Sequence, residues 1–323
     1  MHSQKTVKRR DKERVILRIS EQEHPKTGKK YHVWPLLDFS WAVDDYLLGM
    51  THILRGKDLY METKMEKHIW DVLGIDYSNV EFIHTGLMNI EGIGLSSSEA
   101  RRKIDSGKYS NWEDPRTWSI RSLKARGITP EAIKKFVLST GVSESSSTVP
   151  IDNLYSENRK VIDSKTRRFY FVPEPMKLTV KNLDKLNLKI PMHPTEDMGE
   201  KKYNFNEEGT FYISGKDWKR FKEGDKVRLK GAITVEVTSK NDQLIESKFL
   251  GTDIKADSGN IVQWVTENHV PVSVTLVQGD VQKGYGEKHL EKAEEGETIQ
   301  FERYGFVKIH KKGKEIKAMY SHK

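Results

Sequence analysis

Residues 34–58 read WPLLDFSWAVDDYLLGMTHILRGKD, and this stretch decides the fold. The pattern predicts an extended apolar segment that ends at Asp38, followed by a short amphipathic helix from Phe39 to Leu48 that ends at Gly49. A second extended segment ends at Arg55. Strands that alternate with helices predict a parallel sheet, and ligands of open α/β sheets bind at the carboxyl ends of the strands. Asp38 and Arg55 are therefore the first candidates for a binding site.

The composition sets the limits within which this unit is read. The chain has 323 residues, enough for two or three domains, and 32% of them are charged. It has no apolar run long enough for a membrane span, no apolar signal region after Met1 and no cysteine, which predicts a soluble cytoplasmic protein with no membrane partner. The scattered histidines predict no bound metal, zinc included. The net charge of +8 suits a polyanion such as nucleic acid, although a basic protein without such a partner is the alternative.

The segments around this unit extend the α/β pattern. β-Branched and aromatic residues predict strands over 15–19, 31–37 and 80–84, and the Lys- and Arg-rich residues 1–14 read as a frayed terminus. Residues 60–73 form a helix that ends at Gly74. Its predicted buried face consists of five apolar side chains: Met61, Met65, Ile69, Val72 and Leu73.

A loop rich in glycine and serine occupies residues 85–98. Ser96 and Glu99 have the spacing of a capping box, so a helix is expected to begin there and to run to about Ser106. The free amides of a helix N-terminus and the serine hydroxyls suit a phosphate group, whereas capping alone explains the serines equally well. Both interpretations remain open at this point.

The rest of the chain divides into a helical part and a β part. Helical periods and stop signals predict an all-helical block over residues 98–165, with Ser143 to Ser147 as a flexible link. From residue 166 onward, short extended segments separated by glycine turns predict β-barrels or a sandwich, with length for two small barrels. The first of these extended segments covers residues 168–181.

Several motifs, in this order and spacing, resemble glutamyl-tRNA synthetases of the archaeal and eukaryotic type, class I enzymes related to glutaminyl-tRNA synthetases. The resemblance covers nearly the whole chain. The matching stretches include HPKTG at 24–28, residues 34–58, LSSS at 95–98, WEDPR at 112–116, RGITPEAI at 126–133, PEPMK at 173–177, EGDKVRLK at 223–230 and IQFERYGF at 299–306.

The resemblance implies a multidomain protein with α/β, α and β parts. Residues 1–95 are then the second half of a Rossmann catalytic domain, and residues 96–165 are a helical domain that follows the signature loop. Residues 166–323 are two anticodon-binding β-barrels. The implied reaction joins glutamate to tRNA-Glu with ATP, which arrives as its Mg²⁺ complex.

The same resemblance makes Gly94-Leu95-Ser96-Ser97-Ser98 an ATP-binding loop, with Ser96, Ser97 and Ser98 as its catalytic residues. This loop matches the Lys-Met-Ser-Lys-Ser signature of class I synthetases, which binds the phosphates. The two signature lysines fall on Gly94 and Ser97, so both cations are missing and transition-state charge receives less stabilisation. Lys103, Arg101 or Arg102 are the candidates to replace them.

Four residues are predicted to bind the amino-acid substrate: Leu37, Asp38, His52 and Arg55. Arg55 matches the family arginine that faces the substrate side-chain carboxylate, a position that is not arginine in glutaminyl enzymes. A guanidinium fork pairs with a carboxylate through two hydrogen bonds and leaves a donor unpaired against an amide, so Arg55 favours glutamate. Leu37 stands where the family often has Tyr. Asp38 and His52 are either pocket residues or a helix cap and a satisfied polar side chain.

Basic and aromatic residues of the helical and β parts are the predicted tRNA contacts. Cationic side chains bind phosphates, and aromatic rings stack on unpaired bases. The candidates are Arg116, Arg121, Lys124, Arg126, Trp264 and Arg303.

One part of such an enzyme has no counterpart in the sequence. No HxGH pattern of the first catalytic half occurs in the chain. The sequence is therefore interpreted as the carboxyl-terminal subunit of a split enzyme with a separate N-terminal partner, inactive alone, or as a fragment. A non-catalytic tRNA-binding protein derived from a synthetase is the main alternative, and a glutaminyl-tRNA synthetase is disfavoured by Arg55.

Overall fold

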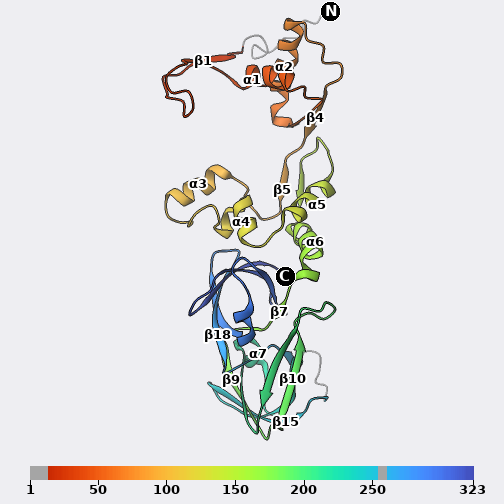
Figure 1. The fold of residues 1–323 in the computed structure, drawn as a ribbon, viewed down its shortest axis with the longest axis vertical. Helices are drawn as coiled ribbons and strands as arrows, with labels where there is room; N and C mark the ends of the chain where they lie inside the picture. The colour runs from red at the N-terminus through yellow and green to blue at the C-terminus, as the bar shows by residue number, and fades with distance from the viewer. Residues whose placement is uncertain (1–13, 254–259) are drawn as a thin grey trace, which may run out of the picture. The chain divides into compact units, whose positions relative to one another are not determined.

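The computed structural model describes residues 14–253 and 260–323, which form two compact units (Figure 1). The first unit comprises Met1–Glu91 and Gly141–Val149, and the second comprises Gly92–Thr140 and Pro150–Lys323. Most of the basic terminal segment predicted to fray, residues 1–13, lies outside the described part. Within the described residues, no helix has the length and apolar character needed to cross a membrane.

The first unit is built from short strand pairs and two helices. Its strands are β1 (Leu17–Ile19), β2 (Val33–Pro35), β3 (His52–Gly56), β4 (Glu81–Thr85), β5 (Met88–Ile90) and β6 (Ser147–Val149), and its helices are α1 (Leu37–Leu47), the 3-10 turn η2 (Lys57–Leu59) and α2 (Tyr60–Leu73). β3 pairs with β4 in parallel, β5 pairs with β6 in parallel, and β1 pairs with β2 antiparallel. β3 and β4 are thus parallel neighbours, and α2 connects them. β2 pairs with β1 and not with β3.

The core of the first unit lies where α1 and α2 meet β3. Ala42, Ile53 and Trp70 are buried there, and the Trp70 indole donates a hydrogen bond of 2.7 Å to the Ala42 carbonyl. Gly74 ends α2 in the left-handed conformation, as predicted. The predicted buried face of this helix is wrong in its last turn, because Val72 and Leu73 are 71% and 61% exposed.

Polar residues take the place of that apolar face. Thr63 and Glu66 are buried on α2 beside Trp70. Periodicity in hydrophobicity cannot reveal such a face, because it counts a buried carboxylate as a solvent residue. The predicted start of α1 at Phe39 is two residues too late: the helix begins at Leu37, so Asp38 lies inside the first turn and is no N-cap.

The helical part of the second unit begins at the serine loop. It contains α3 (Ser97–Asp105), η3 (Pro115–Thr117), α4 (Ile120–Ala125), α5 (Pro130–Thr140), α6 (Ile151–Ile162) and η4 (Asp163–Lys165). Ser96 is the N-cap of α3 and accepts a hydrogen bond from the Glu99 backbone N–H, which confirms the capping prediction.

The prediction of an all-helical block over residues 98–165 is wrong at residues 141–149. Residues 141–149 belong to the first unit, where β6 occupies part of the predicted link. Gly86 lies so close to this segment that a Cβ at position 86 would overlap the Ser145 carbonyl oxygen. A long-range strand pair of three residues has no local signal that a sequence pattern shows.

Two seven-stranded sheets form the rest of the second unit. The first has the order β16 (Ile261–Val262), β13 (Lys226–Leu229), β14 (Thr234–Lys240), β15 (Leu244–Gly251), β9 (Pro175–Lys181), β12 (Gly209–Ser214) and β17 (Val265–Thr266). The second has the order β7 (Arg168–Phe169), β20 (Thr298–Phe301), β21 (Gly305–Lys311), β22 (Ile316–His322), β18 (His269–Thr275), β19 (Val281–Glu287) and β8 (Phe171–Pro173). The β-rich prediction is confirmed at the level of sheets, each with its own hydrophobic core.

The predicted extended segment 168–181 is divided between the two sheets. β7 and β8 join the second sheet and β9 joins the first, with Glu174 at the change of direction in a left-handed conformation (φ 48°). The Glu174 carbonyl accepts from the Gly215 N–H at 2.9 Å, and its own N–H donates to the Lys283 carbonyl at 3.3 Å. A few further elements were not predicted: the hairpin β10 (Leu186–Pro191) and β11 (Glu200–Phe205), β19, α7 (Gly215–Arg220) and η6 (Lys288–Lys292).

Candidate functional site

Arg55 is held by several side chains of the first unit. It is the fourth residue of β3, and only 9% of it is exposed. Its Nη2 lies 3.0 Å from Asp45 Oδ2 and 2.5 Å from Glu66 Oε2, and its Nη1 donates to Thr63 Oγ1 at 3.2 Å. The guanidinium also lies 4.3 Å from the centroid of the Trp41 ring. Arg55 is therefore part of a buried cluster and does not form a surface ion pair.

Arg55, Asp45, Thr63 and Glu66 form a cluster whose charge depends on the protonation of Glu66. Burial raises the pKa of Glu66 to about 7, against the attraction of Arg55, and the neighbouring Asp45 adds to the rise. One cation thus serves two carboxylates at a buried place, an arrangement that is more frequent at functional sites than elsewhere. Sequence reasoning missed Asp45, Thr63 and Glu66. The only available signal was their spacing around Arg55 on the two neighbouring helices.

The other three predicted substrate residues have different surroundings. Asp38 is buried and pairs with Arg14 at 2.8 Å, and Arg14 also reaches Glu62 at 3.1 Å. His52 is exposed and its ring lies 3.6 Å from a Glu81 carboxylate oxygen. Leu37 is 49% exposed at the start of α1. Asp38 therefore links α1 to the segment before β1.

The serine loop is exposed from Gly94 to Ser98 and lies beside a cavity of about 220 Å³ within the second unit. Gly94, Ser96, Lys103 and Arg116 are among the residues that line it. Of the three suggested replacement cations, Lys103 lines this cavity. It also pairs with Glu99 at 2.5 Å, which raises the pKa of Lys103.

The predicted tRNA contacts of the helical part fall into two groups. Arg121 and Lys124 are exposed on α4, and Arg116 is partly exposed. Arg116 binds Asp114 through Nε at 2.8 Å and Nη2 at 2.7 Å, and these bonds hold the pKa of Asp114 below its usual value even though burial opposes this. Arg126 has no exposed surface and donates to the carbonyls of Tyr320 and Ser321. We therefore do not retain Arg126 as a tRNA contact.

The two candidates in the β part also differ in exposure. Trp264 is completely buried in the core of the first sheet, where its indole donates to the Lys230 carbonyl at 3.0 Å, so its ring presents no face to a ligand. The prediction that Trp264 contacts tRNA is therefore wrong, because Trp264 is a core residue. Arg303 is exposed, stands in the left-handed conformation (φ 61°) and donates to the Ile261 carbonyl.

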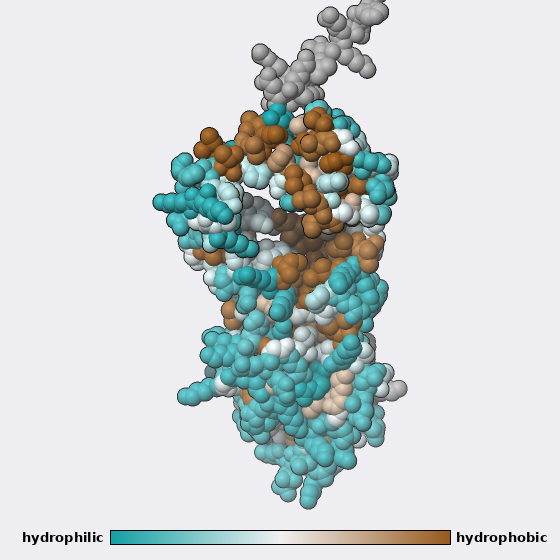
Figure 2. All heavy atoms as spheres, turned by 45° about the horizontal axis from the view of Figure 1, so that its top comes forward, coloured by the Kyte–Doolittle hydropathy of each residue, from teal (hydrophilic) through white to brown (hydrophobic). Residues whose placement is uncertain are grey.

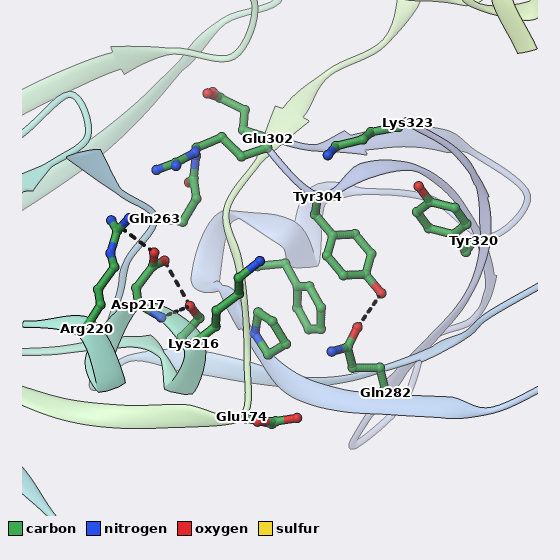
Figure 3. A pocket seen from close by; sticks show the side chains of 14 residues that line it. Glu174, Lys216, Asp217, Arg220, Gln263, Gln282, Glu302, Tyr304, Tyr320 and Lys323 are labelled. Atoms are coloured by element: carbon green, nitrogen blue, oxygen red, sulfur yellow. Dashed lines mark hydrogen bonds and ion pairs between the residues drawn. The ribbon is translucent and has the colours of Figure 1, made fainter. Parts of the chain in front are cut away.

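Arg303 lines a cavity of about 590 Å³, shown in Figure 3. Side chains of α7 (Lys216, Asp217 and Arg220) lie on one side of the view, and Gln282, Tyr304 and Tyr320 lie on the other. Asp217 pairs with Arg220 at 3.2 Å, and the Tyr304 hydroxyl donates to Gln282 at 2.8 Å. The sequence predictions assign no role to Lys216, Asp217, Arg220, Gln282 or Tyr320.

Metal binding has no support from clustered side chains. The described residues contain no group of three or more His, Asp or Glu side chains that is suited to hold a metal ion.

Known proteins match the chain along its length. A family profile described as "tRNA synthetases class I (E and Q), catalytic domain" matches residues 1–164, and two profiles for the anti-codon binding domain of these synthetases match residues 166–251 and 261–310. A glutamate–tRNA ligase of Methanopyrus kandleri is 37% identical over 320 residues, which cover 96% of this chain and 56% of the relative.

Two further relatives show the same pattern. A glutamate–tRNA ligase of Pyrococcus horikoshii is 38% identical over 313 residues, covering 94% of this chain and 54% of the relative. That of Methanocaldococcus jannaschii is 38% identical over 302 residues, covering 92% and 53%. The chain thus spans a little more than half the length of the curated relatives it matches.

Proposed function

Since the chain belongs to the class I tRNA synthetases of the glutamate and glutamine (E and Q) family, we propose that it is the carboxyl-terminal part of a glutamate–tRNA ligase. The reaction has two steps: the glutamate α-carboxylate attacks the α-phosphorus of ATP, releasing pyrophosphate, and a ribose hydroxyl of the tRNA end then attacks the acyl-adenylate. Catalysis of this kind depends on positioning and charge stabilisation. The observation that carries the proposal is the similarity to glutamate–tRNA ligases over more than nine-tenths of the chain.

Arg55 is the proposed specificity residue. A guanidinium offers donors in a planar fork that matches a carboxylate, and the Trp41 ring and Thr63 hold that fork in place. A glutamine side chain would leave one of these donors without an acceptor, which disfavours the amide. Near neutral pH, protonation of Glu66 would lower the negative charge beside Arg55. A substrate carboxylate could then pair with the Arg55 guanidinium with less repulsion.

Residues 94–98 are the proposed phosphate-binding loop. The α3 N-terminus supplies backbone N–H groups, Ser96 to Ser98 supply hydroxyls, and Lys103 supplies a cation on the same cavity. This donor set fits a polyphosphate. Mg²⁺ is proposed to enter bound to the ATP phosphates, since its preferred ligands are oxygens of phosphate and water.

An apolar surface of the first unit supports the proposal that a further protein segment packs against it. Several of its hydrophobic residues are strongly exposed: Leu47 and Leu48 at the end of α1, Leu54 in β3, and Val72 and Leu73 at the end of α2. Figure 2 shows brown side chains gathered over part of the molecular surface. Exposed apolar patches of this kind mark interaction surfaces. We infer that the first half of the catalytic domain covers it, either as a separate N-terminal chain or as part of a longer polypeptide.

The tRNA is proposed to bind along the second unit. Arg116, Arg121 and Lys124 are the proposed phosphate contacts of the helical part, and Arg303 is the proposed contact of the β part, where the two sheets would form the anticodon-binding barrels. The net charge of +8 agrees with a polyanionic ligand. Binding should therefore weaken steeply as salt rises.

The test begins with the chain alone. It should bind tRNA but fail to exchange pyrophosphate with ATP, because the complementary half of the nucleotide site is absent. Mixed with the segment of a relative that precedes the matched region, it should aminoacylate tRNA with glutamate. Robust pyrophosphate exchange by the pure chain would overturn the half-enzyme proposal.

Arg55→Ala should abolish glutamate selection in that reconstituted enzyme, measured as a loss of at least about a hundredfold in kcat/KM. Arg18→Ala, in exposed β1, is the matched control and should behave like the unmodified protein. Unchanged glutamate kinetics in Arg55→Ala would remove Arg55 from the site.

A non-catalytic tRNA-binding protein is the second candidate. The missing signature lysines at Gly94 and Ser97 favour it. It predicts tRNA binding with no aminoacylation under any reconstitution. A glutaminyl-tRNA synthetase would instead charge tRNA with glutamine, against the preference expected of Arg55.

A further inference from the structure

The cavity of about 590 Å³ in the second unit contains a buried amide without a partner. Gln263 lies in the short segment between β16 and β17, lines the cavity and is only 7% exposed. Neither the nitrogen nor the oxygen of its side-chain amide has a hydrogen-bond partner among residues 14–253 and 260–323. Burying an unpaired amide is unfavourable, so such groups are rare in native structures and require an explanation.

The neighbours of Gln263 hold it in this position. Val262 and Trp264 on either side of it are completely buried in the core of the first sheet. The backbone around Gln263 is therefore fixed by core packing, which directs the side chain toward the cavity. A second amide at the same cavity behaves differently: Gln282 accepts a hydrogen bond from Tyr304 at 2.8 Å. Gln263 is thus the cavity amide whose hydrogen-bonding groups have no partner among the described residues.

The charges and rings around the cavity indicate the class of ligand. Asp217 is neutralised by Arg220, and Glu302 is paired with Lys230, whereas Lys216 has no ion pair within the described residues. Of the other charged lining residues, Lys216, Arg303 and Lys323 are cationic and Glu174 is anionic, and this excess of positive charge favours a phosphate group. Tyr304 and Tyr320 supply aromatic surface, the feature with which proteins hold unpaired bases.

We propose that Gln263 is a base-reading residue, whose amide donates one hydrogen bond to and accepts one from the edge of an unpaired nucleobase of the tRNA anticodon. This inference rests on the proposed function. An amide presents a donor beside an acceptor, and so does the pairing edge of a base, so two hydrogen bonds satisfy both partners together. The free energy lost on leaving Gln263 unpaired in the free protein is then recovered when the tRNA binds.

The experiment compares Gln263→Met with the unmodified full chain. The Met side chain preserves length and volume but removes both polar atoms. The probes are transcripts of tRNA-Glu with single-base changes at each of the three anticodon positions, and dissociation constants are measured at one fixed salt concentration. The unmodified chain should discriminate at one position by roughly tenfold to a hundredfold, the effect of a bidentate amide–base contact, and Gln263→Met should lose that preference at that position alone.

A thermal unfolding scan separates base reading from a structural role. Gln263→Met should unfold at the same or a higher temperature than the unmodified chain, because it removes an unpaired buried amide. Gln263→Glu, which replaces the donor by an acceptor, should weaken binding of the preferred base. Gln243→Met, in an exposed turn of the first sheet, is the matched control and should change neither discrimination nor stability.

Two results would overturn the inference while leaving the proposed function intact. One is full discrimination at all three positions in Gln263→Met. The other is a uniform loss of binding to all transcripts together with a lower unfolding temperature, which would make Gln263 a structural residue. If the unmodified chain fails to bind tRNA at all, the proposed function itself fails, and the inference fails with it.

Discussion

Two buried ion clusters, one in each unit, shift the pKa of a buried glutamate in opposite directions. In the second unit, Glu287 accepts hydrogen bonds from Lys201 Nζ at 3.1 Å, from the Tyr170 backbone N–H at 2.6 Å and from the Tyr203 hydroxyl. Burial opposes ionisation there, yet these groups together hold the pKa of Glu287 below its usual value. In the first unit, burial raises the pKa of Glu66 to about 7.

The difference between the clusters lies in the supply of donors. Glu287 has a cation of its own and two further donors, whereas Glu66 shares Arg55 with Asp45. Burial alone therefore does not decide the charge of a carboxylate; the number of donors per carboxylate does. A satisfied cluster stabilises a fold, and an unsatisfied one is available for a ligand.

The largest test of this contrast is Lys201→Met. Lys201 is completely buried and its Nζ lies 3.7 Å from the Tyr170 ring centroid, so its removal leaves the Glu287 carboxylate without a cation. The free energy of unfolding of the second unit should fall by about 3–5 kcal/mol, the cost of leaving a buried charge unpaired. Hydrogen exchange of β19 peptides across a urea titration measures it.

Lys181→Met provides the matched control for that experiment. Lys181 pairs with Glu246 on the surface, at 2.9 Å and with half of its side chain exposed. Its loss should change stability by well under about 1 kcal/mol. If Lys201→Met were equally mild, the satisfied cluster would not stabilise the second unit.

The next test uses pH on the first unit. Glu66 has a raised pKa, so the folded state holds its proton up to about pH 7 while the unfolded state releases it near the ordinary value of 4.5. Stability from this group is therefore full below about pH 4.5 and is lost as the pH rises to about 7, by about 1–3 kcal/mol.

Glu66→Gln should remove this slope, because the amide stays neutral throughout. Hydrogen exchange of α2 peptides between pH 4.5 and 8, corrected for intrinsic rates, follows the change. Glu91→Gln, at an exposed position, should retain the slope of the unmodified chain. An identical slope in Glu66→Gln would assign the pH dependence to another group.

The smallest test separates the two carboxylates of the first cluster. Asp45→Asn removes the like charge beside Glu66 and leaves Arg55 to a single carboxylate. The pH midpoint of the stability loss should move below about 7, because repulsion by Asp45 contributes to the raised pKa of Glu66. The same hydrogen-exchange experiment measures this pH midpoint. A midpoint that rises instead would contradict the idea that Asp45 and Glu66 share the Arg55 cation.

Local signals in the sequence were sufficient to predict where individual helices begin and end. Ser96 with Glu99, Thr129 before Pro130, and Gly74 mark helix ends through hydrogen bonds or backbone conformations that involve only neighbouring residues. The family resemblance likewise depends on local motifs, and the matches to known synthetases confirm it.

Contacts between residues that are distant in the sequence could not be predicted in the same way. The buried face of α2 contains Glu66 because Arg55, eleven positions earlier in the chain, neutralises part of its charge. Trp264 and Arg126 looked like ligand contacts by residue type, and packing places both in the interior. Residue type therefore indicated chemistry without showing whether a side chain faces solvent, a core or a cavity.

The sequence by itself determined the family, the order of the α/β, helical and β parts, and Arg55 as the candidate for substrate selection. These follow from local patterns, which act over a few residues. Only the tertiary structure decided that segment 168–181 is divided between two sheets at Glu174, that Arg55 serves two carboxylates, and that Gln263 faces a cavity without a partner. Burial and hydrogen-bond satisfaction are properties of residues brought together from distant positions, so they exist only once the chain has folded.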